Sequence, residues 1–252
     1  MLCKQYGNIK IDVQELNIDL LSMSAHKFYG PKGVGALYVR NGLDFIKILD
    51  GGHQERNKRA GTENVAGIVG LGKAITLAYE EFDKNNNHLK ELRDYYIYEV
   101  EKRIKNVKIN GDRINRLPGN ANISFREVDG ESLLLNLDLK GICASSGSAC
   151  SSGSIDPSHV LLSIGLDEKD AAGALRVTFG KENTKDDVDY LVESLTEIVD
   201  KLRNIKTWKN NERACIARPK IEKRMDDLRS LLYRKVIIKV MELYVKGKHH
   251  HT

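Results

Sequence analysis

The sequence predicts an α/β fold, and three observations support this prediction. Short apolar segments of strand length alternate with segments of helical periodicity along most of the chain, which is the pattern of layered α/β domains. The 252 residues, 41% of them hydrophobic, are enough for one large core or two modest cores. Only 4 prolines are present, and no apolar run approaches the roughly 20 residues that cross a bilayer. The composition therefore predicts a globular protein with no membrane partner.

The first part of the chain is predicted to contain two strands and a long helix. Residues 9–21 mix strand-like alternation with short polar breaks, and residues 34–39 (VGALYV) have the composition of a buried strand. Small and apolar side chains then recur at helical spacing over residues 62–82, with Thr62 as the candidate N-cap.

A domain boundary is predicted near residue 85, because Asn85–Asn87 interrupt the helical pattern before it resumes over residues 89–104. Strands and helices alternate again beyond this point, as in a second α/β domain. The predicted strands are 107–110, 121–125 and 175–178, and the predicted helices are 131–139, 157–164 and 185–202. The expected organisation is a first domain over residues 1–85, a second over 86–204 and a tail over 205–252.

The tail contains the basic charge of the chain. The formal net charge is +5, and residues 205–252 hold 13 Lys and Arg against 5 Asp and Glu. Residues 221–245 have apolar side chains at helical spacing, which predicts an amphipathic helix that seeks a partner surface. A basic tail can contact nucleic acid or acidic lipid, but such runs are more often solvated helix faces, so nucleic acid is an unlikely partner.

The cysteines predict a protein with reduced thiols. The four cysteines show no paired metal-ligand spacing, and the first ten residues do not resemble a signal peptide. No metal site is expected, and the three histidines at 249–251 suggest a tag remnant or a chance run. We therefore expect a cytoplasmic location.

Two segments contain residue types that can do chemistry. Residues 144–154 (ASSGSACSSGS) are all small, and among them only Cys150 is strongly nucleophilic. Such a run orders at a high entropic cost, so Cys150 is either a reactive thiol on a flexible arm or part of an inert loop. Cys143, among apolar neighbours, is expected to be structural. Lys27 ends an apolar stretch and is either a Schiff-base lysine with a lowered pKa or a surface lysine.

Four motifs together resemble one enzyme family. They are Ser24–Gly33 (SAHKFYGPKG), Gln54–Glu55 with Arg59–Asn64 (RAGTEN), Ser145–Ser154 (SSGSACSSGS) and Ala174–Val177 (ALRV). In this order they resemble cysteine desulfurases of the iron-sulfur-assembly and nitrogen-fixation type, which are pyridoxal-phosphate enzymes of the class-V aminotransferase family. The resemblance covers about residues 6–204. It implies part of a large fold-type-I cofactor domain with a mainly parallel sheet, a complete smaller α/β domain and a helical tail.

The resemblance implies a role for each motif residue. Lys27 would hold pyridoxal 5'-phosphate as an aldimine and move the substrate α-proton, while Ser24 and His26 would bind the cofactor phosphate. Thr62 would reach the phosphate site of a neighbouring subunit, which implies a homodimer. Arg176 would bind the substrate carboxylate, for which a planar guanidinium is well suited. The Cys150 thiolate would take sulfur from L-cysteine, leaving a persulfide and releasing L-alanine.

The resemblance also implies a truncated chain. The family's segment whose aspartate pairs with the pyridinium nitrogen falls on residues 1–4, which here are Met-Leu-Cys-Lys. The chain is therefore expected to lack the N-terminal half, which leaves open whether it is active by itself. In an active enzyme the persulfide would serve a sulfur acceptor such as an iron-sulfur scaffold. The alternatives are a selenocysteine lyase or another class-V enzyme, a non-catalytic dimerising fragment and, last, a nucleic-acid-binding module that uses the tail.

Overall fold

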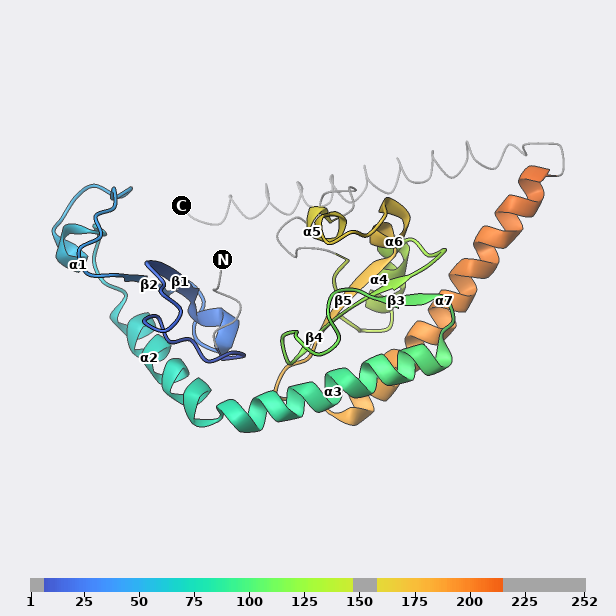
Figure 1. The fold of residues 1–252 in the computed structure, drawn as a ribbon, viewed down its shortest axis with the longest axis horizontal. Helices are drawn as coiled ribbons and strands as arrows, with labels where there is room; N and C mark the ends of the chain where they lie inside the picture. Colours follow the sequence, from blue (N-terminus) through green and yellow to red (C-terminus); the bar gives the residue numbers. More distant parts are fainter. Residues whose placement is uncertain (1–6, 147–157, 215–252) are drawn as a thin grey trace, which may run out of the picture. The chain divides into compact units, whose positions relative to one another are not determined.

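The structure is a computed structural model that describes residues 7–146 and 158–214, with only the backbone for residues 206–214. The chain divides into two compact units, residues 1–202 and 203–252. Figure 1 shows the helices and strands, coloured along the sequence. None of the helices in the described part of the chain is both long and apolar enough to cross a membrane.

A two-stranded antiparallel hairpin begins the described chain. β1 (Leu20–Ser24) pairs with β2 (Gly35–Val39), so that Leu20 lies opposite Val39. The prediction of a strand over residues 9–21 is wrong for most of this range, because β1 begins only at Leu20. Asp12 explains the difference: its carboxylate accepts backbone N–H groups of the two residues 14 and 15 at 2.8 and 3.1 Å, which favours a turn over a strand.

The prediction that residues 34–39 are buried is also wrong. The side chains at the start of β2 are exposed, and Leu37 keeps 52% of its surface accessible. The small cluster of buried residues beside this hairpin consists of Ala25, Phe28, Leu71 and Ala74. No β2 side chain belongs to it, so the apolar composition of this strand does not result in burial.

The single turn α1 (Gln54–Asn57) precedes two consecutive helices, α2 (Val65–Glu80) and α3 (Phe82–Arg103). α2 begins later than predicted because Asn64, and not Thr62, is its N-cap. The Asn64 side chain accepts the Gly67 N–H at 3.0 Å.

The predicted interruption at Asn85–Asn87 is wrong, since all three asparagines lie inside α3. The break falls at Glu81, whose φ of −96° and ψ of 7° leave the helical range. Asn85 fits the new helix because its N–H donates to the Glu81 carbonyl at 2.9 Å and its side chain donates to the Glu81 carboxylate at 3.2 Å. The division at residues 85 and 86 into domains stays a prediction.

A three-stranded antiparallel sheet forms the centre of the main core. β4 (Asn120–Phe125) lies between β3 (Val107–Ile109) and β5 (Ala174–Thr178). Buried side chains of α3, α4 (Gly130–Asp138) and α7 (Lys185–Ala214) pack with those of β4 and β5. The core includes Tyr96, whose ring meets the Phe179 ring edge-on at 5.7 Å.

Of the three helices predicted between residues 130 and 204, the one over residues 131–139 agrees closely with α4, and the other two differ in their bounds. The helix expected over residues 157–164 is shorter, since α5 spans His159–Ser163, and α6 (Glu168–Ala172) follows it. α7 extends beyond the predicted end at residue 202, to Ala214. The helix predicted over residues 221–245 lies outside the described residues.

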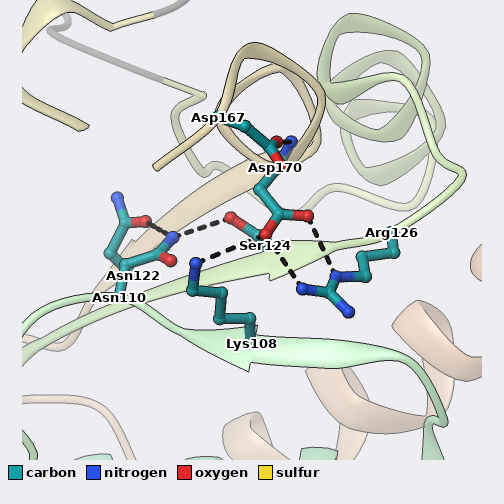
Figure 2. Close-up of polar contacts among 7 residues, drawn as sticks. All are labelled: Lys108, Asn110, Asn122, Ser124, Arg126, Asp167 and Asp170. Atoms are coloured by element: carbon teal, nitrogen blue, oxygen red, sulfur yellow. Dashed lines mark hydrogen bonds and ion pairs between the residues drawn. The ribbon is translucent and has the colours of Figure 1, made fainter. Parts of the chain in front are cut away.

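Polar contacts join α6 to the sheet. Asp170 of α6 is buried, and its carboxylate accepts from both Nε and Nη2 of Arg126 at 3.0 and 3.1 Å and from Lys108 Nζ at 3.4 Å (Figure 2). Beside them, the Asn110 side chain donates to Ser124 Oγ at 2.8 Å. These bonds hold α6 against the sheet. Only Gly173 separates α6 from β5, so they also fix the start of β5.

Every strand pair within the described residues is antiparallel. The parallel strands expected for the cofactor domain are therefore not among these elements. The short connection between β1 and β2 accounts for their direction, since parallel neighbours need a long crossover. The chain nevertheless combines helices and sheets as an α/β protein.

Candidate functional site

Lys27 lies in the turn between β1 and β2. Ala25 and Phe28 are buried, whereas His26 and Lys27 between them are exposed. This turn is the 3-10 helix η1 (Ala25–Phe28). A 3-10 helix has three residues per turn, so Ala25 and Phe28 fall on one side of η1. The two apolar side chains pack against α2 and thereby present the imidazole and the amine outward.

The turn is fixed by close backbone packing at Gly30. Its N–H donates to the Ala25 carbonyl at 2.9 Å. A Cβ on Gly30 would lie 2.8 Å from the Ala25 Cβ and 3.1 Å from the Ala74 Cβ of α2. Glycine is therefore required for the lysine turn to approach α2 this closely.

Thr62 lies apart from this turn in the sequence, in the loop that precedes α2, and its side chain is exposed. The loop is shaped by Arg59, whose Nη1 donates to the carbonyls of Gly61 at 2.8 Å and Thr62 at 3.3 Å. Gly61 adopts a φ of 103°, which favours glycine.

Arg176 is half-buried near the centre of β5, opposite Asn122 of β4. Its other backbone edge pairs with Ser145: the Arg176 N–H donates to the Ser145 carbonyl at 2.6 Å, and the Ser145 N–H donates back at 3.1 Å. The segment that leads to Cys150 thus starts beside Arg176. Cys150 itself lies outside the described residues. Cys143 is exposed, so the expectation that it is a structural cysteine is not supported by burial.

Five side chains with predicted roles share one property. Within the described part of the chain, no hydrogen bond or ion pair engages the polar end of any of them. They are Ser24, His26, Lys27, Thr62 and Arg176. A half-buried guanidinium such as that of Arg176, which has no carboxylate partner among the described residues, is suited to an anionic ligand. The structure brings Ser24, His26 and Lys27 together in one turn and places Thr62 and Arg176 on other elements.

The chemistry of the first three donors fits one end of pyridoxal phosphate. A serine hydroxyl and a histidine ring can donate to a phosphate, and a lysine amine can condense with an aldehyde. These residues would hold the phosphate and aldehyde ends of the cofactor. The acidic partner of the ring nitrogen has no counterpart at residues 1–4. The fit therefore concerns the phosphate and aldehyde ends.

Sequence reasoning missed one contact beside these residues. The Tyr29 hydroxyl accepts the backbone N–H of Lys181, 152 positions away, at 3.0 Å. Tyr29 occurs within the SAHKFYG motif and has a left-handed φ of 65°, but neither feature identifies its partner.

The fold is that of an α/β protein with a serine, a histidine and a lysine in one turn, and the comparisons identify its family. A model described as "Aminotransferase class-V" matches residues 2–191. The chain therefore belongs to the class-V aminotransferase family.

Curated relatives are named as desulfurases. Two are each called "Cysteine desulfurase IscS": the chain is 56% identical to the Dictyoglomus turgidum protein over 212 residues and to the Clostridium botulinum protein over 201 residues. These alignments cover 82% and 79% of this chain, but 54% and 51% of the relatives. The chain spans about half the length of the curated relatives it matches.

Solved structures agree with the fold class predicted from the sequence. A NifS-like protein from Rickettsia africae superimposes with a TM-score of 0.72 at 32% identity, covering 79% of this chain and 52% of the other. A structure titled "SspA in complex with cysteine" has a TM-score of 0.54 at 32% identity and covers 72% and 50%. The α/β prediction is confirmed, as is the predicted family.

Proposed function

We propose that this chain is the part of a cysteine desulfurase that contains the cofactor lysine, the substrate arginine and the sulfur-accepting cysteine. The observation that supports this most directly is the turn at Ser24–Lys27, where the exposed His26 and Lys27 and the half-buried Ser24 have no side-chain partner among the described residues. The 56% identity to desulfurases indicates the reaction. The substrate would be L-cysteine.

The residues would divide the work as follows. Ser24 and His26 would bind the phosphate of pyridoxal phosphate, and Lys27 would bind its aldehyde carbon. When bound, this cofactor withdraws electrons from the carbon next to the amine that it holds. After the substrate amine has replaced Lys27 on the aldehyde carbon, the freed Lys27 amine would take the substrate α-proton, while the Arg176 guanidinium would hold the carboxylate in two-pronged hydrogen bonds.

Cys150 would complete the sulfur transfer. Its thiolate attacks the substrate sulfur, a sulfur–sulfur bond forms, and the bond between that sulfur and Cβ breaks. The bonding electron pair would stay with Cβ, which takes up a proton, and Lys27 would return the α-proton to Cα, so that the products are alanine and a Cys150 persulfide. Ser145 would fix the start of the Cys150 segment beside Arg176, because it exchanges two backbone hydrogen bonds with that residue.

The chain would form a homodimer in the cytoplasm. In this dimer the exposed Thr62 of one subunit would reach the phosphate site of the other. The sulfur would pass to an acceptor protein, such as an iron-sulfur scaffold.

A cofactor titration tests the role of Lys27. The purified chain is mixed with pyridoxal phosphate, and the visible absorbance of lysine-bound cofactor is recorded for wild type and Lys27→Ala. Lys32→Ala is the matched control, since Lys32 is an exposed lysine on the same connection between β1 and β2. Wild type and Lys32→Ala are expected to develop the band and Lys27→Ala is not. Equal bands in all three proteins would contradict the assignment.

An alanine-release assay tests the role of Cys150. Cys150→Ser is expected to lose release of alanine from L-cysteine, whereas Cys143→Ser, at an exposed cysteine seven positions earlier, should retain it. Cofactor binding without alanine release by wild type would favour a non-catalytic fragment. A preference for selenocysteine would indicate the lyase alternative.

A further inference from the structure

The connection between β5 and α7 contacts the lysine turn directly. Tyr29, the residue that ends η1, accepts the Lys181 backbone N–H on its hydroxyl at 3.0 Å. The Lys181 ammonium lies 5.1 Å from the centre of the Tyr29 ring, within the range of a cation–π interaction. The same ammonium lies 3.9 Å from a carboxylate oxygen of Glu81, at the break between α2 and α3. One residue of this connection thus interacts with two other elements.

The connection between β5 and α7 also contacts α3. Gly180 donates its N–H to the Asn183 side chain at 2.8 Å, and the Asn183 carbonyl lies 2.9 Å from His88 Nε2 of α3. A Cβ on Gly180 would come within 3.0 Å of the Tyr29 hydroxyl, so a larger residue here would push against Tyr29. The connection is therefore fixed between η1 and α3.

These contacts close a circuit. η1 packs on α2 through buried Ala25 and Phe28, and α2 is joined to α3 at Glu81. α3 holds the connection through His88, and Tyr29 links the connection back to η1. Several weak contacts arranged in a closed circuit restrict relative motion more than the same contacts in an open chain, because each one limits the freedom of the others.

Tyr29 lies two residues after Lys27, and Lys181 lies five residues after Arg176. Tyr29 is 65% exposed, so burial of apolar surface does not explain a tyrosine at this place. We propose that Tyr29 is a positioning residue, which fixes the spacing between the Lys27 amine and the Arg176 guanidinium. This inference rests on the proposed function for the roles of those two residues. An α-amino acid has its amine and carboxylate on one carbon, so binding both groups requires a constant spacing.

A distance measurement on the cofactor-free chain tests the spacing. Spin labels are attached at Lys32→Cys and Thr178→Cys, both exposed positions beside the two sites, after the four native cysteines are replaced by serine. Tyr29→Phe removes only the hydroxyl acceptor and is expected to broaden the label-to-label distance distribution. Tyr98→Phe, at another exposed tyrosine, is the matched control and should leave it unchanged. An unchanged distribution in Tyr29→Phe would overturn the proposal.

A second variant separates the hydroxyl from the cation. Lys181→Met keeps the backbone N–H and removes the contacts with the Tyr29 ring and Glu81. It is expected to broaden the distribution less than Tyr29→Phe. Circular dichroism confirms that each variant is folded, and Lys181→Met still tests the circuit if Tyr29→Phe does not fold.

A binding comparison tests the connection to Arg176. L-Cysteine has an amine and a carboxylate, whereas cysteamine has the amine and thiol without the carboxylate. On the cofactor-loaded chain, Tyr29→Phe should weaken the binding of L-cysteine several-fold and leave the binding of cysteamine unchanged. An equal loss for both probes would overturn a role through Arg176. If no cofactor binds, the proposed function fails, whereas the label distances still decide whether Tyr29 fixes the spacing.

Discussion

At the scale of single residues, the carboxylate of Asp170 is a buried group that its neighbours keep negatively charged. Its side chain is buried between Arg126 and Lys108 (Figure 2). The hydrogen bonds from Arg126, followed by those from Lys108, hold the pKa of Asp170 below its ordinary value of 3.8, although burial acts in the opposite direction. A carboxyl with a lowered pKa stabilises the fold above its unfolded pKa, and this contribution disappears as the pH falls through the lowered value.

Replacing Asp170 is therefore expected to cost stability in a pH-dependent way. Asp170→Asn should lower the free energy of unfolding by about 1 to 3 kcal/mol at neutral pH, because charge-assisted hydrogen bonds are lost from a buried site. The difference between wild type and variant should shrink as the pH falls from 3.8 through the lowered pKa, because the carboxyl takes up a proton first in the unfolded chain and then in the folded protein. Urea unfolding followed by circular dichroism at several pH values measures both effects.

Asp138→Asn provides the control for this prediction. Asp138 is an exposed aspartate at the end of α4 whose carboxylate has no hydrogen bond within the described residues. Its replacement should change stability little at any pH. A pH-independent loss in Asp170→Asn would show that shape, and not charge, is what this position contributes.

At the scale of elements, two glycines illustrate opposite requirements. Gly173 joins α6 to β5, and its carbonyl accepts the Phe125 N–H at 2.9 Å. A Cβ there would lie 2.5 Å from the Phe125 carbonyl oxygen. Gly72 lies in the interior of α2, and a Cβ there would meet nothing within 4 Å. Gly173→Ala should therefore destabilise the protein by about 1 to 3 kcal/mol through overpacking.

Gly72→Ala should instead stabilise the protein, by roughly 0.5 to 1 kcal/mol, because alanine has the higher helix propensity. The two substitutions add the same methyl group, so a comparison of their urea unfolding midpoints isolates the effect of the surroundings. A loss of stability in Gly72→Ala would indicate that another surface covers this face of α2 in solution.

At the scale of the whole molecule, burial is unevenly distributed along the chain. Among the residues that the structure describes, the core around β4 and β5 contains 21 buried apolar residues, whereas the cluster beside the β1–β2 hairpin contains 4. Exposed apolar side chains are frequent in the first part, where Ile46 and Ile48 keep 93% and 94% of their surface accessible. Regions with few buried contacts open at a lower free energy than well-packed ones.

Hydrogen exchange should therefore separate the two parts. The backbone amides of β1 and β2 are expected to exchange much faster than those of β4 under native conditions, since less apolar surface is lost when they open. Mass spectrometry of peptides from each strand measures this difference. Protection of β1 and β2 equal to that of β4 would show that the hairpin is covered in solution.

The sequence by itself determined the features that depend on neighbouring residues. The strands near residues 121–125 and 175–178 and the start of the helix at residue 185 follow from local periodicity, and the structure confirms them. The grouping of Ser24, His26 and Lys27 is equally local, because one turn holds all three. The motif order was sufficient to predict the family, which the comparisons confirm.

Only the tertiary structure decided which distant residues meet and which apolar segments are buried. Tyr29 and Lys181 are 152 positions apart, and Arg126 and Asp170 are 44 apart. Periodicity within a window of a few turns contains no information about such pairs. β2 has the composition of a buried strand, but its first three residues are exposed and its last two only half-buried, because burial depends on what the fold places against a strand. Composition and spacing describe a segment's preference, whereas packing against the rest of the chain determines its surroundings.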